Sequence, residues 1–157
     1  MNLNVVGVDL VGSSHRLDPD ITCLRLIEIS LSTWIPDRRF DPITRVHGLH
    51  YIGDKLGLIG RAASWLADEG LFVASLDLAN LRLADGRAAG RVVTSDLRRA
   101  GLGYDRRERL VVCRGRRVVN LPYLYLGADD LAGPNSTGQP AVDSYYRPGA
   151  AAPTRPV

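Results

Sequence analysis

Residues 45–78, "RVHGLHYIGDKLGLIGRAASWLADEGLFVASLDL", decide the fold of this chain. Asp54 is placed to cap a helix, because apolar residues recur at helical spacing from Leu56 onward. Gly70 follows as the expected helix stop. The apolar run that comes next is typical of a parallel strand covered on both faces. The stretch therefore predicts a helix over 54–68 and a buried strand over 71–78.

The rest of the chain predicts further strands joined by turns. They are expected near 4–9, 22–29, 42–46, 109–114 and 117–126. The last two flank "RGRR", which predicts a β-hairpin with Gly115 in its turn. A short helix is expected at 95–101. The predicted class is α/β, with a loose tail at 147–157.

Composition places the chain among soluble globular proteins. Its 157 residues suffice for one domain with a core, and 45% of them are hydrophobic. No apolar run reaches the roughly 20 residues of a membrane span, and the first residues lack a secretory pattern. Cys23 and Cys113 lie in apolar runs and are expected to be buried thiols. We therefore expect a cytoplasmic protein without a membrane partner.

The basic residues are almost all arginine, and Lys55 is the only lysine. Arginines are densest in "DLRRAGLGYDRRERLVVCRGRRVV", residues 96–119. Acidic residues interleave with them and few aromatic residues do, so a nucleic-acid partner is not indicated.

A longer stretch, residues 40–78, "FDPITRVHGLHYIGDKLGLIGRAASWLADEGLFVASLDL", resembles the back half of a class I S-adenosylmethionine-dependent methyltransferase. In that family a strand with a Phe-Asp start is followed by a polar loop, a helix, an L-x-x-x-G turn and a buried strand. The expected hairpin at 109–126 is similar to the family's last two strands, one of them antiparallel. The resemblance implies an incomplete Rossmann-like methyltransferase sheet with a C-terminal β-hairpin. The methyltransferase-like domain implied in this way covers residues 1–146 and is truncated at its N-terminus. A disordered tail is expected at 147–157.

The same resemblance implies roles for five residues. Asp9 corresponds to the acid that bonds the ribose hydroxyls of the cofactor, and Glu28 lies near the acid that flanks the adenine. His47, His50 and Tyr51 fall in the loop where the family places substrate and sometimes a catalytic base. Four of them have a structural alternative. Asp9 also fits a strand end, Glu28 a solvated edge, and His50 and Tyr51 the packing of a helix start.

One family feature is missing from the sequence. The family fixes the methionine part of its cofactor with a glycine-rich loop after its first strand, and no such stretch occurs here. By the resemblance, the chain begins at the family's second strand and lacks the central one. We therefore expect an inactive or incomplete protein that binds S-adenosylmethionine weakly or not at all. Free strand edges predict self-association or pairing with a separate N-terminal half.

Two other interpretations stay open. The chain could be a non-catalytic binding module that uses the arginine-rich hairpin or the 127–146 flap. It could also be an intact enzyme that holds the cofactor by an unfamiliar loop. No Asn-Pro-Pro-Tyr signature follows residue 46, so methylation of DNA bases is not favoured. For an ancestral enzyme, a small molecule is the expected methyl acceptor.

Overall fold

A computed structural model describes residues 3–10, 20–45, 48–134, 138 and 140–149. The chain divides into two compact units, Met1–Asp37 and Arg38–Val157. Each unit is described by itself. The α/β class predicted from the sequence is confirmed, because both units contain parallel strands and the second contains two α-helices.

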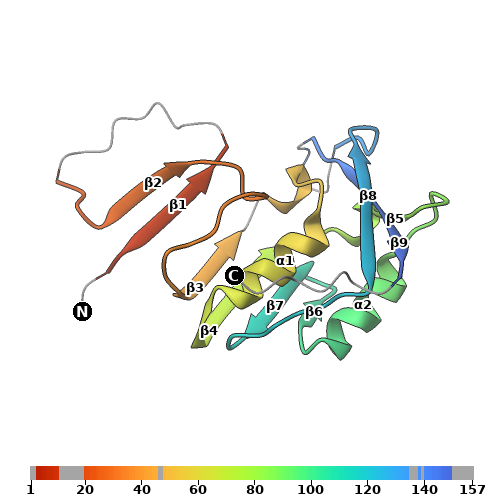
Figure 1. The fold of residues 1–157 in the computed structure, drawn as a ribbon. Helices are drawn as coiled ribbons and strands as arrows, with labels where there is room; N and C mark the ends of the chain where they lie inside the picture. The colour runs from red at the N-terminus through yellow and green to blue at the C-terminus, as the bar shows by residue number, and fades with distance from the viewer. Residues whose placement is uncertain (1–2, 11–19, 46–47, 135–137, 139, 150–157) are drawn as a thin grey trace. The chain divides into compact units, whose positions relative to one another are not determined.

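The first unit contains a parallel pair of strands (Figure 1). They are β1, Val5–Asp9, and β2, Leu24–Glu28, as the sequence predicted. Their register pairs Val5 with Leu24 and Asp9 with Glu28. The two carboxylates therefore end neighbouring strands at the same edge. The turn expected between these two strands lies mostly outside the described residues, which omit 11–19.

The second unit contains seven strands, two α-helices and two turns of 3-10 helix within its described residues. In chain order they are β3 Phe40–Arg45, η1 Leu49–Tyr51, α1 Lys55–Ser64, β4 Leu66–Ser75, η2 Leu78–Asn80, β5 Leu81–Leu83, α2 Gly90–Arg99, β6 Gly103–Asp105, β7 Leu110–Arg114, β8 Tyr123–Asp129 and β9 Asp143–Pro148.

Four of these strands form one sheet in the order β3-β4-β7-β6. β3 and β4 are parallel, whereas β7 is antiparallel to β4 on one side and to β6 on the other. A reversed strand thus lies between two strands that share one direction. Figure 1 shows α1 lying across this sheet. Its buried side chains Ile59 and Ala63 are fully covered, as are Leu66 of β4 and Val111 of β7.

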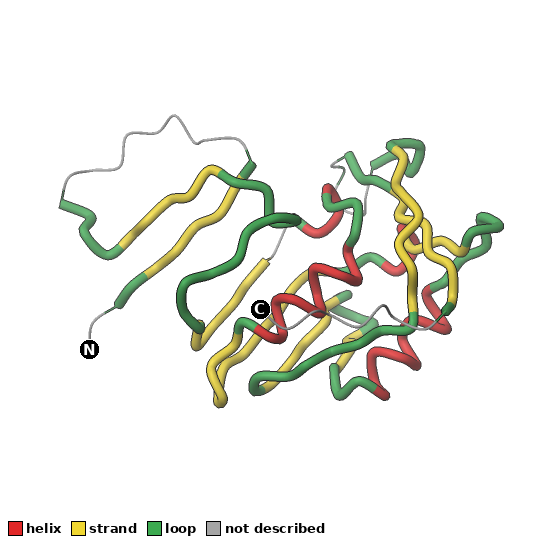
Figure 2. Tube along the Cα trace, viewed as in Figure 1, coloured by secondary structure: helices red, strands yellow, loops and turns green. Residues whose placement is uncertain are grey.

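Three strands form a smaller sheet in the order β5-β9-β8 (Figure 2). β9 is parallel to β5 and antiparallel to β8. The ring of Tyr146, 1% exposed, packs against the rings of Tyr123 and Tyr125 at centroid distances of 6.1 and 5.7 Å. These aromatic contacts, together with the strand pairing, join β9 to β8.

The predicted helix exists but is shorter than expected. Asp54 caps it, because its Oδ1 accepts the Gly57 N–H at 3.0 Å. The helix ends at Ser64, and β4 already begins at Leu66. Gly70 is therefore a strand residue and no helix stop. A Cβ at Gly70 would lie 2.8 Å from the Phe40 carbonyl oxygen, so glycine is needed where the β3 backbone approaches.

The predicted hairpin at 109–126 is wrong. Both edges of β7 are occupied, by β4 and by β6, so the following segment cannot pair with it. That segment reaches β8 only at Tyr123, and β8 pairs with β9 instead. The actual hairpin joins β6 to β7. In its turn Asp105 accepts the backbone N–H groups of Arg107 and Glu108 at 2.8 and 3.0 Å.

Three smaller expectations also change. The helix predicted at 95–101 begins earlier, at Gly90. Cys113 is buried as expected, but Cys23 is exposed just before β2. Part of the expected tail is ordered, because β9 runs to Pro148, while 150–157 lie outside the described residues. The 127–146 flap contributes to both β8 and β9.

Gly115 provides a test of the turn after β7. Its φ is +70°, and an added Cβ would lie 2.8 Å from the Asp68 carbonyl oxygen. Gly115→Ala should therefore lower the free energy of unfolding by about 2 kcal/mol or more, from left-handed strain and the clash together. Urea unfolding measures this.

The matched control is Gly86→Ala. Gly86 also has a positive φ, +82°, but nothing lies within 4 Å of an added Cβ. Its cost should be only the conformational term, about 1 kcal/mol. Equal losses in the two variants would contradict the packing of Gly115 against Asp68.

Candidate functional site

Two loops and one strand meet at the carboxyl ends of β3 and β4, the edge where open α/β sheets usually bind ligands. After β3 comes η1, and after β4 comes η2. The start of β9 is bonded to both loops. The Val142 N–H donates to the His50 carbonyl at 3.0 Å, and the Asn80 amide donates to Asp143 at 3.1 Å.

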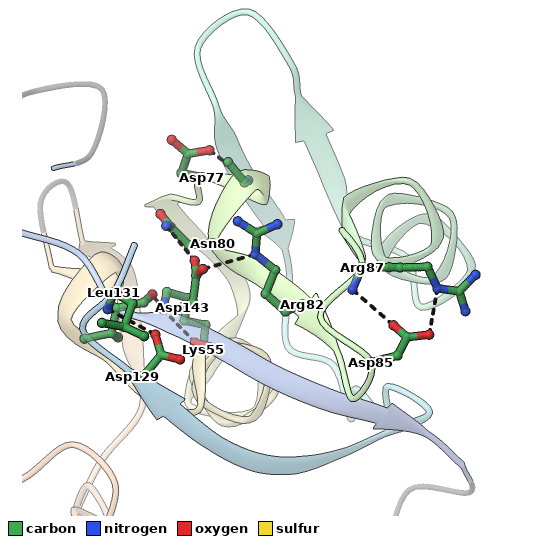
Figure 3. A network of polar contacts seen from close by, with 12 residues as sticks. Lys55, Asp77, Asn80, Arg82, Asp85, Arg87, Asp129, Leu131 and Asp143 are labelled. Carbon is green, nitrogen blue, oxygen red and sulfur yellow. Dashed lines mark hydrogen bonds and ion pairs between the residues drawn. The ribbon is translucent and has the colours of Figure 1, made fainter. Parts of the chain in front are cut away.

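Lys55, the first residue of α1, is the centre of this arrangement (Figure 3). Its side chain is 1% exposed. The ammonium donates to three oxygens: the Ile52 carbonyl at 2.9 Å, the Val142 carbonyl at 2.8 Å and the Ser144 hydroxyl at 2.7 Å. Every donor of the ammonium is therefore satisfied. We call these three contacts the Lys55 clamp.

Burial lowers the pKa of Lys55 from its ordinary value of 10.5 to about 8, and the nearby Asp143 carboxylate opposes this shift. The Ser144 hydroxyl can serve either protonation state. It accepts from the ammonium, and it could donate to the lone pair of a neutral amine. Ser144 is fully buried, so we assign this pair to positioning and not to attack on a substrate.

Asp143 is the acidic member of the same network (Figure 3). Its two oxygens accept from the Asn80 amide and from Arg82 Nε, each at 3.1 Å. Asp143 is 6% exposed, so both partners are needed to offset its desolvation. The network joins α1, η2, β5 and β9, and it fixes the start of β9 at the carboxyl edge of the larger sheet.

Tyr146 adds a further tie between β9 and α1. Its hydroxyl accepts the Leu56 N–H at 3.1 Å and donates weakly to the capping carboxylate of Asp54 at 3.4 Å. Burial is the main cause that raises the pKa of Tyr146 above its ordinary value. The hydroxyl therefore stays protonated and structural at neutral pH.

The predicted cofactor residues lie together in the first unit. Asp9 and Glu28 are register partners at the ends of β1 and β2, and both are exposed. The Leu10 N–H donates to Asp9 Oδ1 at 2.6 Å. The structure thus brings these two residues side by side, and their cofactor role stays a prediction.

The predicted catalytic residues lie in the second unit. His47 falls outside the described residues. His50 is 8% exposed in η1, and its ring centroid lies 4.0 Å from that of Tyr51. Tyr51 is 52% exposed and lines a cavity. Tyr51 is therefore accessible to a ligand, whereas the buried ring of His50 packs against the Tyr51 ring.

The cavity has a volume of about 380 Å³. Its wall includes Tyr51 from η1 and Asp130, Pro140, Ala141 and Val142 from the segment between β8 and β9. Val142 is the residue whose carbonyl accepts from Lys55, so the clamp fixes one wall. Among the described residues, no three His, Cys, Asp or Glu side chains are grouped as a metal site would need.

Sequence reasoning missed Lys55, Asp143, Ser144 and Asn80 as site residues. One signal was available for Lys55, because it is the single lysine among many arginines and stands at a helix start. The others come from η2 and from the start of β9, far from Lys55 in sequence. No local sequence pattern predicts that these residues lie close to Lys55.

Comparison of the chain with protein families, with curated proteins and with solved structures found no match. Within the described residues, no helix has the length and apolar character that a membrane crossing requires.

The Lys55 clamp makes a prediction for stability against pH. The native state should lose the Lys55 proton near pH 8 and the unfolded chain near 10.5. Between these values the unfolded chain binds more protons, so this group makes stability rise with pH. The rise should be about 3 kcal/mol in total. In Lys55→Met it should vanish, which urea unfolding of both proteins from pH 7 to 10.5 measures.

Subtracting the two profiles cancels the titration of all other groups. Because Lys55 is the only lysine, ¹³C-labelled lysine gives one side-chain signal whose midpoint can be followed directly. A midpoint at the ordinary value of 10.5, or a pH-independent difference between the proteins, would contradict the buried clamp.

Proposed function

We propose that this chain is an S-adenosylmethionine-dependent methyltransferase-like protein with a small-molecule methyl acceptor. The observation that carries the proposal is the strand order β3-β4-β7-β6, in which β7 alone is reversed. The resemblance at 40–78 implies parallel strands followed by two closing strands, one of them antiparallel. The observed order supports that reading, although the hairpin is formed by β6 and β7.

The parallel pair in the first unit gives separate support. The resemblance assigns Asp9 and Glu28 to ribose and adenine, and the register of β1 and β2 makes these residues direct neighbours. A carboxylate suits a ribose because it accepts two hydroxyl hydrogens. Both residues end their strands, which is where cofactors bind in this class of sheet.

The chain has few features that could orient the methyl group of the cofactor toward an acceptor. Methyl transfer depends on holding the sulfonium in line with its acceptor, so most of the catalytic benefit is positioning. The sequence contains no glycine-rich loop to approach the methionine part. We therefore propose weak cofactor binding and no turnover by this chain on its own.

Calorimetric titration with S-adenosylmethionine tests the proposal. The dissociation constant should be about 0.1–1 mM, or −4 to −5.5 kcal/mol. Asp9→Ala should weaken binding by about 0.5–1.5 kcal/mol, since an exposed carboxylate contributes less than a buried one. Asp41→Ala is the matched control, because Asp41 is an exposed acid of the second unit. Micromolar affinity would argue against the assignment of β1 as the strand that carries the ribose-binding acid. Equal effects of both substitutions would argue against it as well.

A second candidate function is a non-catalytic module that binds an anionic partner. Ten arginines between 87 and 117 are all exposed. Two of the interleaved acids are engaged: Asp96, 13% exposed, accepts from the Tyr123 hydroxyl at 2.7 Å, and Asp105 binds backbone N–H groups of its turn. Five of the ten arginines are ion-paired with acids, namely Arg87, Arg99, Arg107, Arg109 and Arg116, so a partner would be met mainly by the other five.

Fluorescence anisotropy with a short labelled DNA duplex tests this second candidate. If the arginines contact phosphates, affinity should fall steeply between about 50 and 200 mM salt. Arg98→Ser with Arg117→Ser should reduce the slope of log affinity against log salt by about two. Arg25→Ser with Arg147→Ser, which removes two exposed arginines elsewhere, should leave the slope unchanged. No salt dependence, or equal loss in both variants, would rule the module out.

A further inference from the structure

We propose that the cavity beside η1 binds a small organic cation that carries a substituted ammonium group. The residues that define this ammonium site are Tyr51 and Asp130, with Ala141 and Val142 as its apolar wall. The inference does not rest on the proposed function, since it concerns binding without S-adenosylmethionine.

The chemistry of the wall selects the charge of the ligand. Tyr51 and Asp130 are the only lining side chains with polar groups among those described, and Asp130 carries the only charge. The remaining lining residues are glycine, proline, alanine and valine. Among the described lining residues, an anion would meet this carboxylate with no positive charge to offset it. A cation with methyl or methylene groups would meet both the carboxylate and the apolar wall.

Tyr51 is presented as an aromatic face for such a cation. Its ring is half-exposed and tilts at 49° against the buried ring of His50. The His50 carbonyl is in turn bonded to the Val142 N–H at 3.0 Å. The backbone segments that carry the aromatic face and the apolar wall are therefore bonded to each other. Aromatic faces attract ammonium groups through the negative charge of their π system.

Asp130 is distinguished from the acids near it by its contacts. Asp129 accepts the Leu131 N–H at 3.1 Å, and Asp143 is held by Asn80 and Arg82. Within the described part of the chain, no hydrogen bond or ion pair engages the Asp130 carboxylate, which is exposed at the cavity. Its negative charge is therefore available to a ligand.

The Lys55 ammonium lies behind the wall, 2.8 Å from the Val142 carbonyl oxygen. Its charge opposes a bound cation, while the adjacent Asp143 carboxylate attenuates that effect. The cavity volume of about 380 Å³ is at the small end of ligand sites, which range over about 300–1,000 Å³. The small volume favours a compact cation, and the Lys55 charge weakens its binding.

Choline is the probe, and its neutral carbon isostere dimethylbutanol is the matched ligand. Both are titrated into the ¹⁵N-labelled full chain while amide signals are followed by NMR. Choline should shift the Ala141 and Val142 amides and should bind about threefold or more tightly than the isostere. Asp130→Asn and Tyr51→Leu should each weaken choline binding by about threefold, with little effect on the isostere.

Asp41→Asn controls for the loss of one negative charge, because Asp41 is exposed on β3 and does not line the cavity. It should leave choline binding unchanged, and thermal unfolding checks that each variant is folded. Equal binding of choline and the isostere would overturn the proposal. The proposal would also be overturned if choline shifted amide signals elsewhere in the chain and not at the cavity. Choline binding that Asp130→Asn does not weaken would overturn it too. None of these outcomes bears on S-adenosylmethionine binding, which calorimetry measures separately.

Discussion

The arrangement at the carboxyl edge of the larger sheet depends on the three hydrogen bonds that the buried ammonium of Lys55 donates. This ammonium joins the turn before α1 to Val142, which directly precedes β9, and to Ser144 of β9, more than 80 positions later in the chain. A charge this deeply buried is tolerated only when all its donors have acceptors. Removing any one of the three oxygens would leave an unsatisfied donor, so the segment around Val142 is fixed by this requirement.

The reversed strand β7 is the second constraint. It occupies the free edge of β4 and leaves its other edge to the short strand β6. The chain that follows therefore cannot pair with β7, and it forms the smaller sheet with β5 and β9. The hydroxyl of Tyr123, which donates to Asp96 of α2, and that of Tyr146, which contacts α1, bond the smaller sheet to both helices. Both sheets thus contribute to a single unit.

Local patterns predicted several of the local elements, although the helix ends earlier than expected and β4 covers 66–75 in place of 71–78. The capping role of Asp54, the apolar run of β4 and the strands β1 and β2 all follow from neighbouring residues. The hairpin prediction failed because the partner of β7 is chosen by the free edge of β4, which no turn signal encodes. Lys55 was overlooked as a site residue because lysines are usually exposed. Its burial depends on acceptors that are distant in sequence.

The two candidate ligand sites differ in how well their residues are preorganised for binding. Asp9 and Glu28 are exposed at the ends of two short strands, and the sequence supplies no glycine-rich loop to bring backbone N–H groups to a cofactor. The cavity beside η1 differs, because Tyr51 and Val142 are positioned by hydrogen bonds through His50 and Lys55. Preorganised contacts cost less ordering entropy when a ligand binds. The chain is therefore better built to hold a small ligand at η1 than to hold a nucleoside at β1 and β2.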